Sequence, residues 1–101
     1  MYEGYPVELW MIQMILEDGE FDDRIHYCKV ISYDEDKERI QLLLRGEEVD
    51  VISLDGVYGC KIMDGESHTQ CKGTIKERYL NHLGNMIVFQ IENGFYKNNL
   101  N

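Results

Sequence analysis

The sequence predicts an all-β protein, a small six-stranded antiparallel barrel with an additional strand or helix at its N-terminus. Short segments rich in β-branched and aromatic residues recur along the chain, turn-forming residues separate them at regular intervals, and no interior segment shows convincing helical periodicity. Closing the sheet into a barrel also removes exposed strand edges, which a chain of 101 residues has little else to cover.

The N-terminal segment has mixed signals. Within residues 5–17, Leu, Met, Glu and Gln favour a helix, whereas Val7-Glu8-Leu9 begins the apolar–polar alternation of a strand. The alternation favours an extended strand, with a helix as the alternative. We therefore expect a single domain in which residues 1–23 form an N-terminal extension and residues 24–97 form the barrel.

Six strands are expected after this extension. "RIHYCKVISY" and "RIQLLL" flank the turn "DEDKE" and predict a hairpin, and Asp55-Gly56 predicts a tight turn between two further strands. Gly73 lies inside a long strand and indicates a bulge or a close backbone approach. The expected strands are residues 24–33, 39–44, 48–54, 57–63, 69–80 and 86–97.

The net charge of −9 is unevenly distributed. Residues 1–50 contain 14 acidic and 5 basic side chains, whereas residues 51–101 contain 5 of each. Such a surface repels long polyanions, so we expect neither DNA or RNA binding nor attachment to an anionic membrane.

The cellular compartment is expected to be the cytoplasm. The N-terminus lacks the pattern of a signal peptide, and the apolar run Leu9–Leu16 is too short to span a bilayer. The three cysteines are an odd number at wide spacing, which favours free thiols in a reducing compartment.

Catalytic and metal-binding patterns are weak. The pairs His26–Cys28 and His68–Cys71 have ligands that zinc accepts, but no CxxC or HExxH spacing accompanies them. Ser53 is not part of a GxSxG nucleophile motif. We therefore expect no enzymatic activity, no metal and no cofactor.

One strand carries the only concentrated basic face in the sequence. Alternation along residues 70–79 places Lys72, Thr74, Lys76 and Arg78 on one side, with Cys71, Ile75 and Tyr79 on the other. The basic side is either a solvated outer face or a docking face for a small anion or an acidic partner.

The order of strands and the segment Val51-Ile-Ser-Leu-Asp-Gly56 together resemble a PilZ-like domain over about residues 24–97. That family is a six-stranded barrel whose typical members bind the bacterial messenger cyclic di-GMP. Ser53 and Gly56 match the Ser and Gly of its Asp/Asn-x-Ser-x-x-Gly turn, but Val51 replaces the acid or amide. The family's Arg-x-x-x-Arg motif is also absent, because Arg24 has Cys28 at the partner position.

The resemblance implies a non-enzymatic binding module of bacterial signalling that has lost the family's usual nucleotide-binding arginines. Arginine forks bind phosphates and guanine edges bidentately, and here the pair is missing. We therefore expect docking to a protein partner or to a second copy of the chain. The alternative is a receptor for cyclic di-GMP or a related nucleotide with altered chemistry. Its expected binding residues are Ser53, Gly56, Arg24, Lys72, Lys76 and Arg78.

Overall fold

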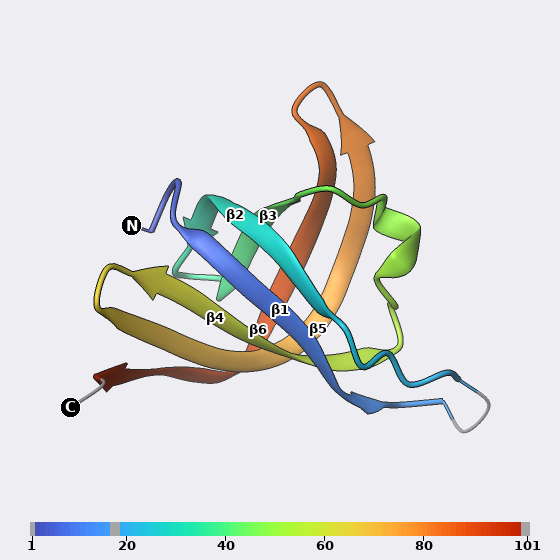
Figure 1. Cartoon of the computed structure of the whole chain (residues 1–101), viewed down its shortest axis with the longest axis horizontal. Coiled ribbons are helices and arrows are strands. Elements are labelled where there is room, and N and C mark those ends of the chain that lie inside the picture. The colour runs from blue at the N-terminus through green and yellow to red at the C-terminus, as the bar shows by residue number, and fades with distance from the viewer. Residues whose placement is uncertain (1, 17–18, 100–101) are drawn as a thin grey trace.

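Six strands form a closed antiparallel barrel in the order β1-β2-β3-β6-β5-β4 (Figure 1). The computed structural model describes residues 2–16 and 19–99, with side chains described up to residue 92. This architecture confirms the predicted fold class. The strands are β1 Pro6–Met14, β2 Ile25–Asp34, β3 Arg39–Leu44, β4 Gly56–Asp64, β5 Ser67–Asn81 and β6 Gly84–Asn99.

The N-terminal segment is a strand of the barrel itself. β1 pairs with β2 along one edge and with β4 along the other, and so closes the sheet. Its alternate residues Val7, Leu9 and Met11 are buried in the core. The strand prediction is therefore confirmed, but the division into an extension and a barrel at residue 24 is wrong. Without β1, the edges of β2 and β4 that it covers would have no strand beside them.

The predicted strand 48–54 is also wrong. Val49–Val51 form a single turn of 3-10 helix, η1, in the connection that crosses one end of the barrel from β3 to β4. Ile52 follows this turn and is fully buried, so it anchors the crossing to the core. The Asp55-Gly56 dipeptide consequently leads into β4 and does not connect two paired strands.

The longest strands, β5 and β6, bend together and wrap around the barrel (Figure 1). Their pairing register shifts on both sides of Lys72 and again between Ile75 and Glu77. At Gly73, a Cβ atom would lie 1.9 Å from the carbonyl oxygen of Gln90. The predicted bulge and close approach at Gly73 are both confirmed, and the glycine allows the two backbones to come this near.

The barrel interior is filled by inward-facing side chains from all six strands, with Tyr58 and Phe89 among the largest fully buried ones. β1, β2 and β3 largely alternate buried and more exposed residues, as a half-buried sheet requires, whereas β6 is buried on both sides at residues 86–89. Within the described residues, no helix is long and apolar enough to cross a lipid bilayer.

Candidate functional site

The turn that contains Ser53 is held by packing and by internal hydrogen bonds. The Ser53 hydroxyl accepts a hydrogen bond from the Asp55 backbone N–H at 3.0 Å, and the Ser53 N–H donates to the hydroxyl of buried Tyr58 at 3.0 Å. A Cβ atom at Gly56 would lie 2.9 Å from both Met11 and Tyr58 side-chain atoms. Ser53 and Gly56 therefore have structural roles that need no ligand.

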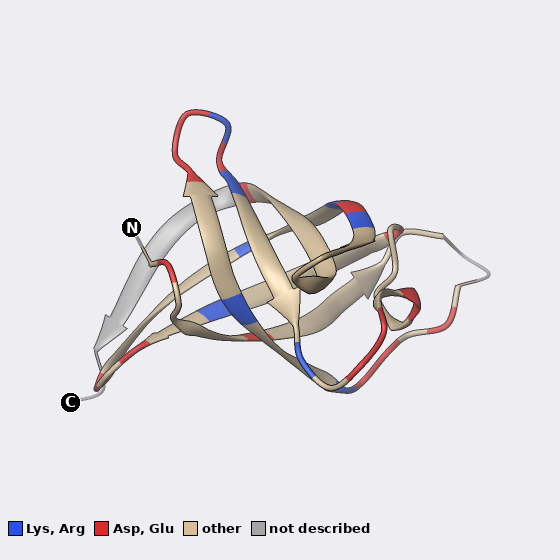
Figure 2. Cartoon of the chain, turned by 90° about the horizontal axis from the view of Figure 1, so that it is seen from above, with Lys and Arg blue, Asp and Glu red and all other residues tan. Residues whose placement is uncertain are grey.

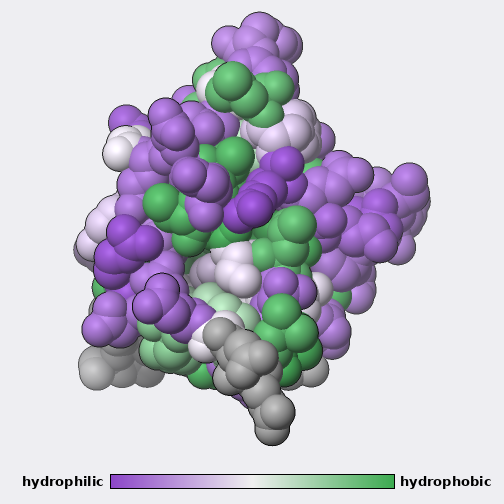
Figure 3. All heavy atoms as spheres, turned by 90° about the vertical axis from the view of Figure 1, so that its right-hand side faces the viewer, coloured by the Kyte–Doolittle hydropathy of each residue, from purple (hydrophilic) through white to green (hydrophobic). Residues whose placement is uncertain are grey.

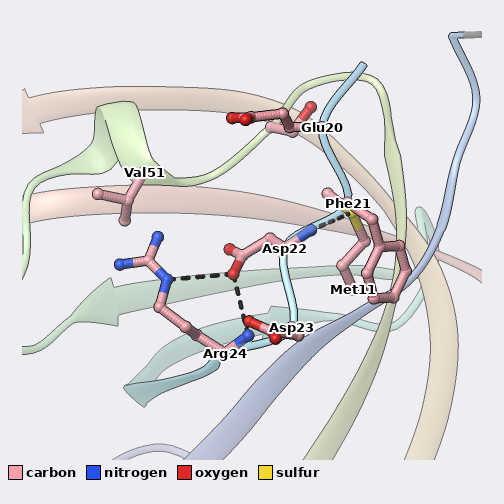
Figure 4. A pocket seen from close by; sticks show the side chains of 8 residues that line it. Met11, Glu20, Phe21, Asp22, Asp23, Arg24 and Val51 are labelled. Atoms are coloured by element: carbon pink, nitrogen blue, oxygen red, sulfur yellow. Dashed lines mark hydrogen bonds and ion pairs between the residues drawn. The ribbon is translucent and has the colours of Figure 1, made fainter. Parts of the chain in front are cut away.

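Arg24 and Ser53 line one pocket of about 340 Å³ at this end of the barrel (Figure 4). The Arg24 Nε lies 3.1 Å from Asp22 Oδ1, and its Nη1 lies 3.7 Å from Glu47 Oε1. The hydrogen bond to Asp22 raises the pKa of the guanidinium. The positive charge of Arg24 is thus offset by neighbouring carboxylates. The remaining lining residues are Met11, Glu20, Phe21, Asp22, Asp23 and Val51.

A buried histidine joins two loops next to this pocket. The His26 ring is fully buried, with Nε2 2.6 Å from Asp22 Oδ2 and Nδ1 2.6 Å from Glu47 Oε2. Asp22 lies in the β1–β2 connection and Glu47 in the β3–η1 connection. Both contacts are donor-to-acceptor hydrogen bonds when the ring carries two N–H groups. The cluster therefore ties both connections to β2.

The predicted basic face of β5 is divided between the two sides of the sheet. Lys72 and Lys76 are exposed and are not among the residues that line the pocket beside Ser53. After the register shift between Ile75 and Glu77, Arg78 pairs with buried Ile87 and so lies on the same side of the sheet as Ile87, although Arg78 itself remains exposed at the barrel end. The prediction that these cations share one face is wrong, because a bulge inserts an extra residue and reverses the alternation.

Arg78 instead reaches η1. Its Nη1 donates hydrogen bonds to the carbonyl oxygens of Val49, Asp50 and Ile52. The Val49 carbonyl also accepts the Ile52 N–H, but the last carbonyls of a helical turn have no partner within the turn, so a guanidinium is well suited to bind them. Tyr79, predicted to lie on the side opposite the cations, accepts a hydrogen bond from Gln41 Nε2 at 3.2 Å and is only partly buried.

The thiols have the environment of structural cysteines. Cys28, Cys60 and Cys71 are all free and buried. Burial raises the pKa of Cys28 to about 12, and a hydrogen bond with Cys71, together with burial, raises the pKa of Cys60 well above its ordinary value. Neutral, inaccessible thiols are poor nucleophiles. In the part of the chain that the structure describes, no three His, Cys, Asp or Glu side chains are grouped to hold a metal ion.

An exposed apolar surface lies on the outer side of β1 and β2, which are paired side by side (Figure 1). Trp10 pairs directly with Ile25, and Tyr27 follows Ile25 on the same side of β2. Ile25 is 47% exposed, Tyr27 56%, and Phe21 in the preceding connection 57%. We call Trp10, Phe21, Ile25 and Tyr27 the β1–β2 face.

The β1–β2 face is continuous with a second pocket, of about 430 Å³. Trp10, Phe21 and Ile25 line this pocket together with Asp22, Asp23 and Arg24, which also line the pocket beside Ser53. The Trp10 indole lies over Gly59, where a Cβ atom would be 2.5 Å from the ring. The neighbouring barrel end, seen in Figure 3, exposes apolar groups among hydrophilic ones.

The sequence did not reveal the β1–β2 face because exposure depends on strand phase. Trp10 lies between the core residues Leu9 and Met11. Because successive side chains of a strand point to opposite sides, burial of Leu9 and Met11 places Trp10 on the outer side of β1. The alternation of Ile25 and Tyr27 with His26 and Cys28 was a usable signal, since one of the two pairs had to face solvent.

Comparisons of the chain with protein-family models, with curated proteins and with solved structures find no match.

Proposed function

We propose that this chain is a non-enzymatic binding module, an atypical PilZ-like barrel of bacterial signalling, that docks a protein partner through the β1–β2 face. The observation that carries the proposal is the gathering of exposed Phe21, Ile25 and Tyr27 around half-buried Trp10 on one surface. Aromatic residues are enriched at the centres of protein interfaces, where they contribute most of the binding energy. Contiguous exposed apolar surface is typical of such sites.

The residues expected to bind nucleotide give less support to the alternative of a cyclic di-GMP receptor. Arg24 is paired with carboxylates, and Arg78 is engaged with the carbonyl groups of η1. Glu20, Asp22 and Asp23 line the same pocket as Ser53. A ligand with two phosphates would approach three carboxylates there, which is electrostatically unfavourable.

Selection of binding peptides tests the proposal. A random peptide library displayed on phage is selected on the immobilised protein, and enriched peptides are synthesised and titrated. Trp10 is the only tryptophan of the chain, so its fluorescence reports binding at the β1–β2 face. We expect Ile25→Ser or Tyr27→Ser to weaken binding by about 10-fold or more, because these side chains lie in the interface.

Leu83→Ser is the matched control. Leu83 is 49% exposed, close to the exposure of Ile25, but lies in the β5–β6 turn. It should leave peptide affinity unchanged. Enrichment of no peptide, or of peptides that respond to Leu83→Ser and not to Tyr27→Ser, contradicts the proposal. Cyclic di-GMP titrated in the same way should give no signal, and binding that is lost in Arg24→Ala would favour the nucleotide receptor.

A further inference from the structure

We infer that the partner presents a basic, amphipathic segment to the β1–β2 face, with its cations directed toward the acidic β1–β2 connection. This inference rests on the proposed function and adds the chemistry of the partner.

The charges that border the face are mainly negative. Figure 2 shows several Asp and Glu residues in the loops at the barrel end that holds the β1–β2 connection, and others in the β2–β3 turn. Glu20 and Asp23 in the β1–β2 connection are exposed, on either side of Phe21 and Asp22 along the chain. Asp22 is engaged by Arg24 and His26, so the exposed carboxylates are the ones available to a partner.

The two cations that line the second pocket are already paired with carboxylates, whereas Lys29 and Arg45 lie beside Tyr27, at the other end of the face. Arg24 is paired with Asp22 and Glu47, and Lys61 lies 3.6 Å from Glu8 in the adjoining strands. At the Phe21 end of the face, an approaching segment therefore meets a negative potential beside apolar surface. Complementary charge at the rim of an interface increases the association rate and discriminates between partners.

The aromatic side chains favour a cation as well. Phe21 is exposed between two pockets and lies in the same segment as the carboxylates of Glu20 and Asp23. Lys and Arg side chains bind over aromatic faces, with their aliphatic stems on apolar surface and their charged ends near carboxylates. A segment that alternates basic and apolar residues can occupy the face and the acidic connection together.

Other occupants fit less well. A second copy of this chain, with its net charge of −9, would bring another acidic surface to the same rim. Nucleic acids and anionic membranes are repelled for the same reason. A neutral apolar peptide would cover Trp10 and Ile25 but leave the exposed carboxylates of Glu20 and Asp23 without a counter-charge.

Two synthetic peptides test the inference. They share the same leucine positions and carry either Lys or Glu at every polar position, and each is titrated into the protein while Trp10 fluorescence and heat are recorded. At about 50 mM salt we expect the Lys peptide to bind at least about 10-fold more tightly than the Glu peptide, and the difference to shrink as salt is added.

A charge-matched pair of variants locates the effect. Glu20→Gln with Asp23→Asn should weaken the Lys peptide about 5-fold or more, because it removes the two exposed carboxylates beside Phe21. Glu35→Gln with Asp36→Asn makes the same charge change in the β2–β3 turn, where both residues are exposed, and should have less than about a 2-fold effect.

Three outcomes overturn the inference: equal binding of the two peptides, tighter binding of the Glu peptide, or no binding of either. Equal effects of the two double variants overturn it as well, because they would show attraction by net charge alone. The proposed function is judged separately. If phage selection enriches acidic or neutral peptides that depend on Tyr27, the face docks a partner but the partner is not basic.

Discussion

Gly73 lies where two strands come into unusually close contact. The Gln90 carbonyl oxygen occupies the space that a Cβ atom of residue 73 would need, at 1.9 Å. A backbone atom held in a sheet moves only if the pairing moves with it. The bend of β5 and β6 around the barrel therefore depends on residue 73 having no side chain.

We expect Gly73→Ala to lower the free energy of unfolding by about 3 kcal/mol or more, since the added methyl group forces the two strands apart. Urea unfolding followed by far-UV circular dichroism measures the change. A variant as stable as the wild type would show that β5 and β6 can separate at this point without loss.

Gly59→Ala is the comparison for Gly73→Ala. A Cβ atom at residue 59 would meet the Trp10 indole, the side chain of a residue that is only partly buried. Because an indole on the surface can swing aside, we expect a smaller loss of stability, about 1 kcal/mol. The displaced indole should also shift the Trp10 fluorescence maximum.

The bulge in β5 decides the structure of a neighbouring element. Before the bulge, Ile75 lies opposite buried Phe89, and after it Arg78 lies opposite buried Ile87. The extra residue between them brings Arg78 onto the same side of the sheet as Ile87, where it binds the carbonyls of η1. A strand irregularity thus positions the connection that crosses the barrel end and carries Ser53.

Replacing Arg78 with Met should lower the free energy of unfolding by about 1–3 kcal/mol, because carbonyl groups of η1 lose a charged donor. Lys76→Met, at an exposed position of the same strand, is the control and should change stability by less than about 0.5 kcal/mol. Both variants are compared by urea unfolding. Equal stability of the two would mean that η1 does not depend on Arg78.

Many of the acidic residues lie in the β1–β2 and β3–β4 connections at one end of the closed barrel, and others lie in the β2–β3 turn (Figure 2). The Asp22–His26–Glu47 cluster stabilises this end by attaching the β1–β2 and β3–η1 connections to β2. Burial by itself would raise the pKa of Asp22, but hydrogen bonds from the Arg24 backbone and the His26 ring outweigh it and lower the pKa below its ordinary value of 3.8.

This lowered pKa predicts how stability depends on pH. The folded protein favours the Asp22 carboxylate, so the stabilisation is complete above pH 3.8 and is lost as pH falls toward the folded-state pKa. Urea unfolding between about pH 6 and pH 2.5 should show a less steep loss of stability for Asp22→Asn than for the wild type. Asp36→Asn, in the exposed β2–β3 turn, should retain the steepness of the wild type. Identical curves for all three proteins would contradict the assignment.

Much of the fold was predictable because strand signals are local. β-branched and aromatic segments defined β2, β3 and most of β4, β5 and β6, and Gly73 marked the bend. The candidate site was less predictable. The predicted residues Ser53, Gly56 and Arg24 do lie at one end of the barrel. Their neighbours Asp22, Glu47 and Tyr58 come from separate loops and strands, so no local sequence pattern indicated them.

By itself, the sequence determined an all-β chain with an acidic first half, because propensity and charge are properties of residues and their near neighbours. Only the tertiary structure decided that β1 closes the barrel, that Arg78 binds the carbonyl groups of η1 and that Trp10 lies on the outer side of β1. These features depend on register and strand phase, and a shift of one residue exchanges the two sides of a strand. The β1–β2 face therefore became visible only once the pairing of β1 with β2 and β4 was known.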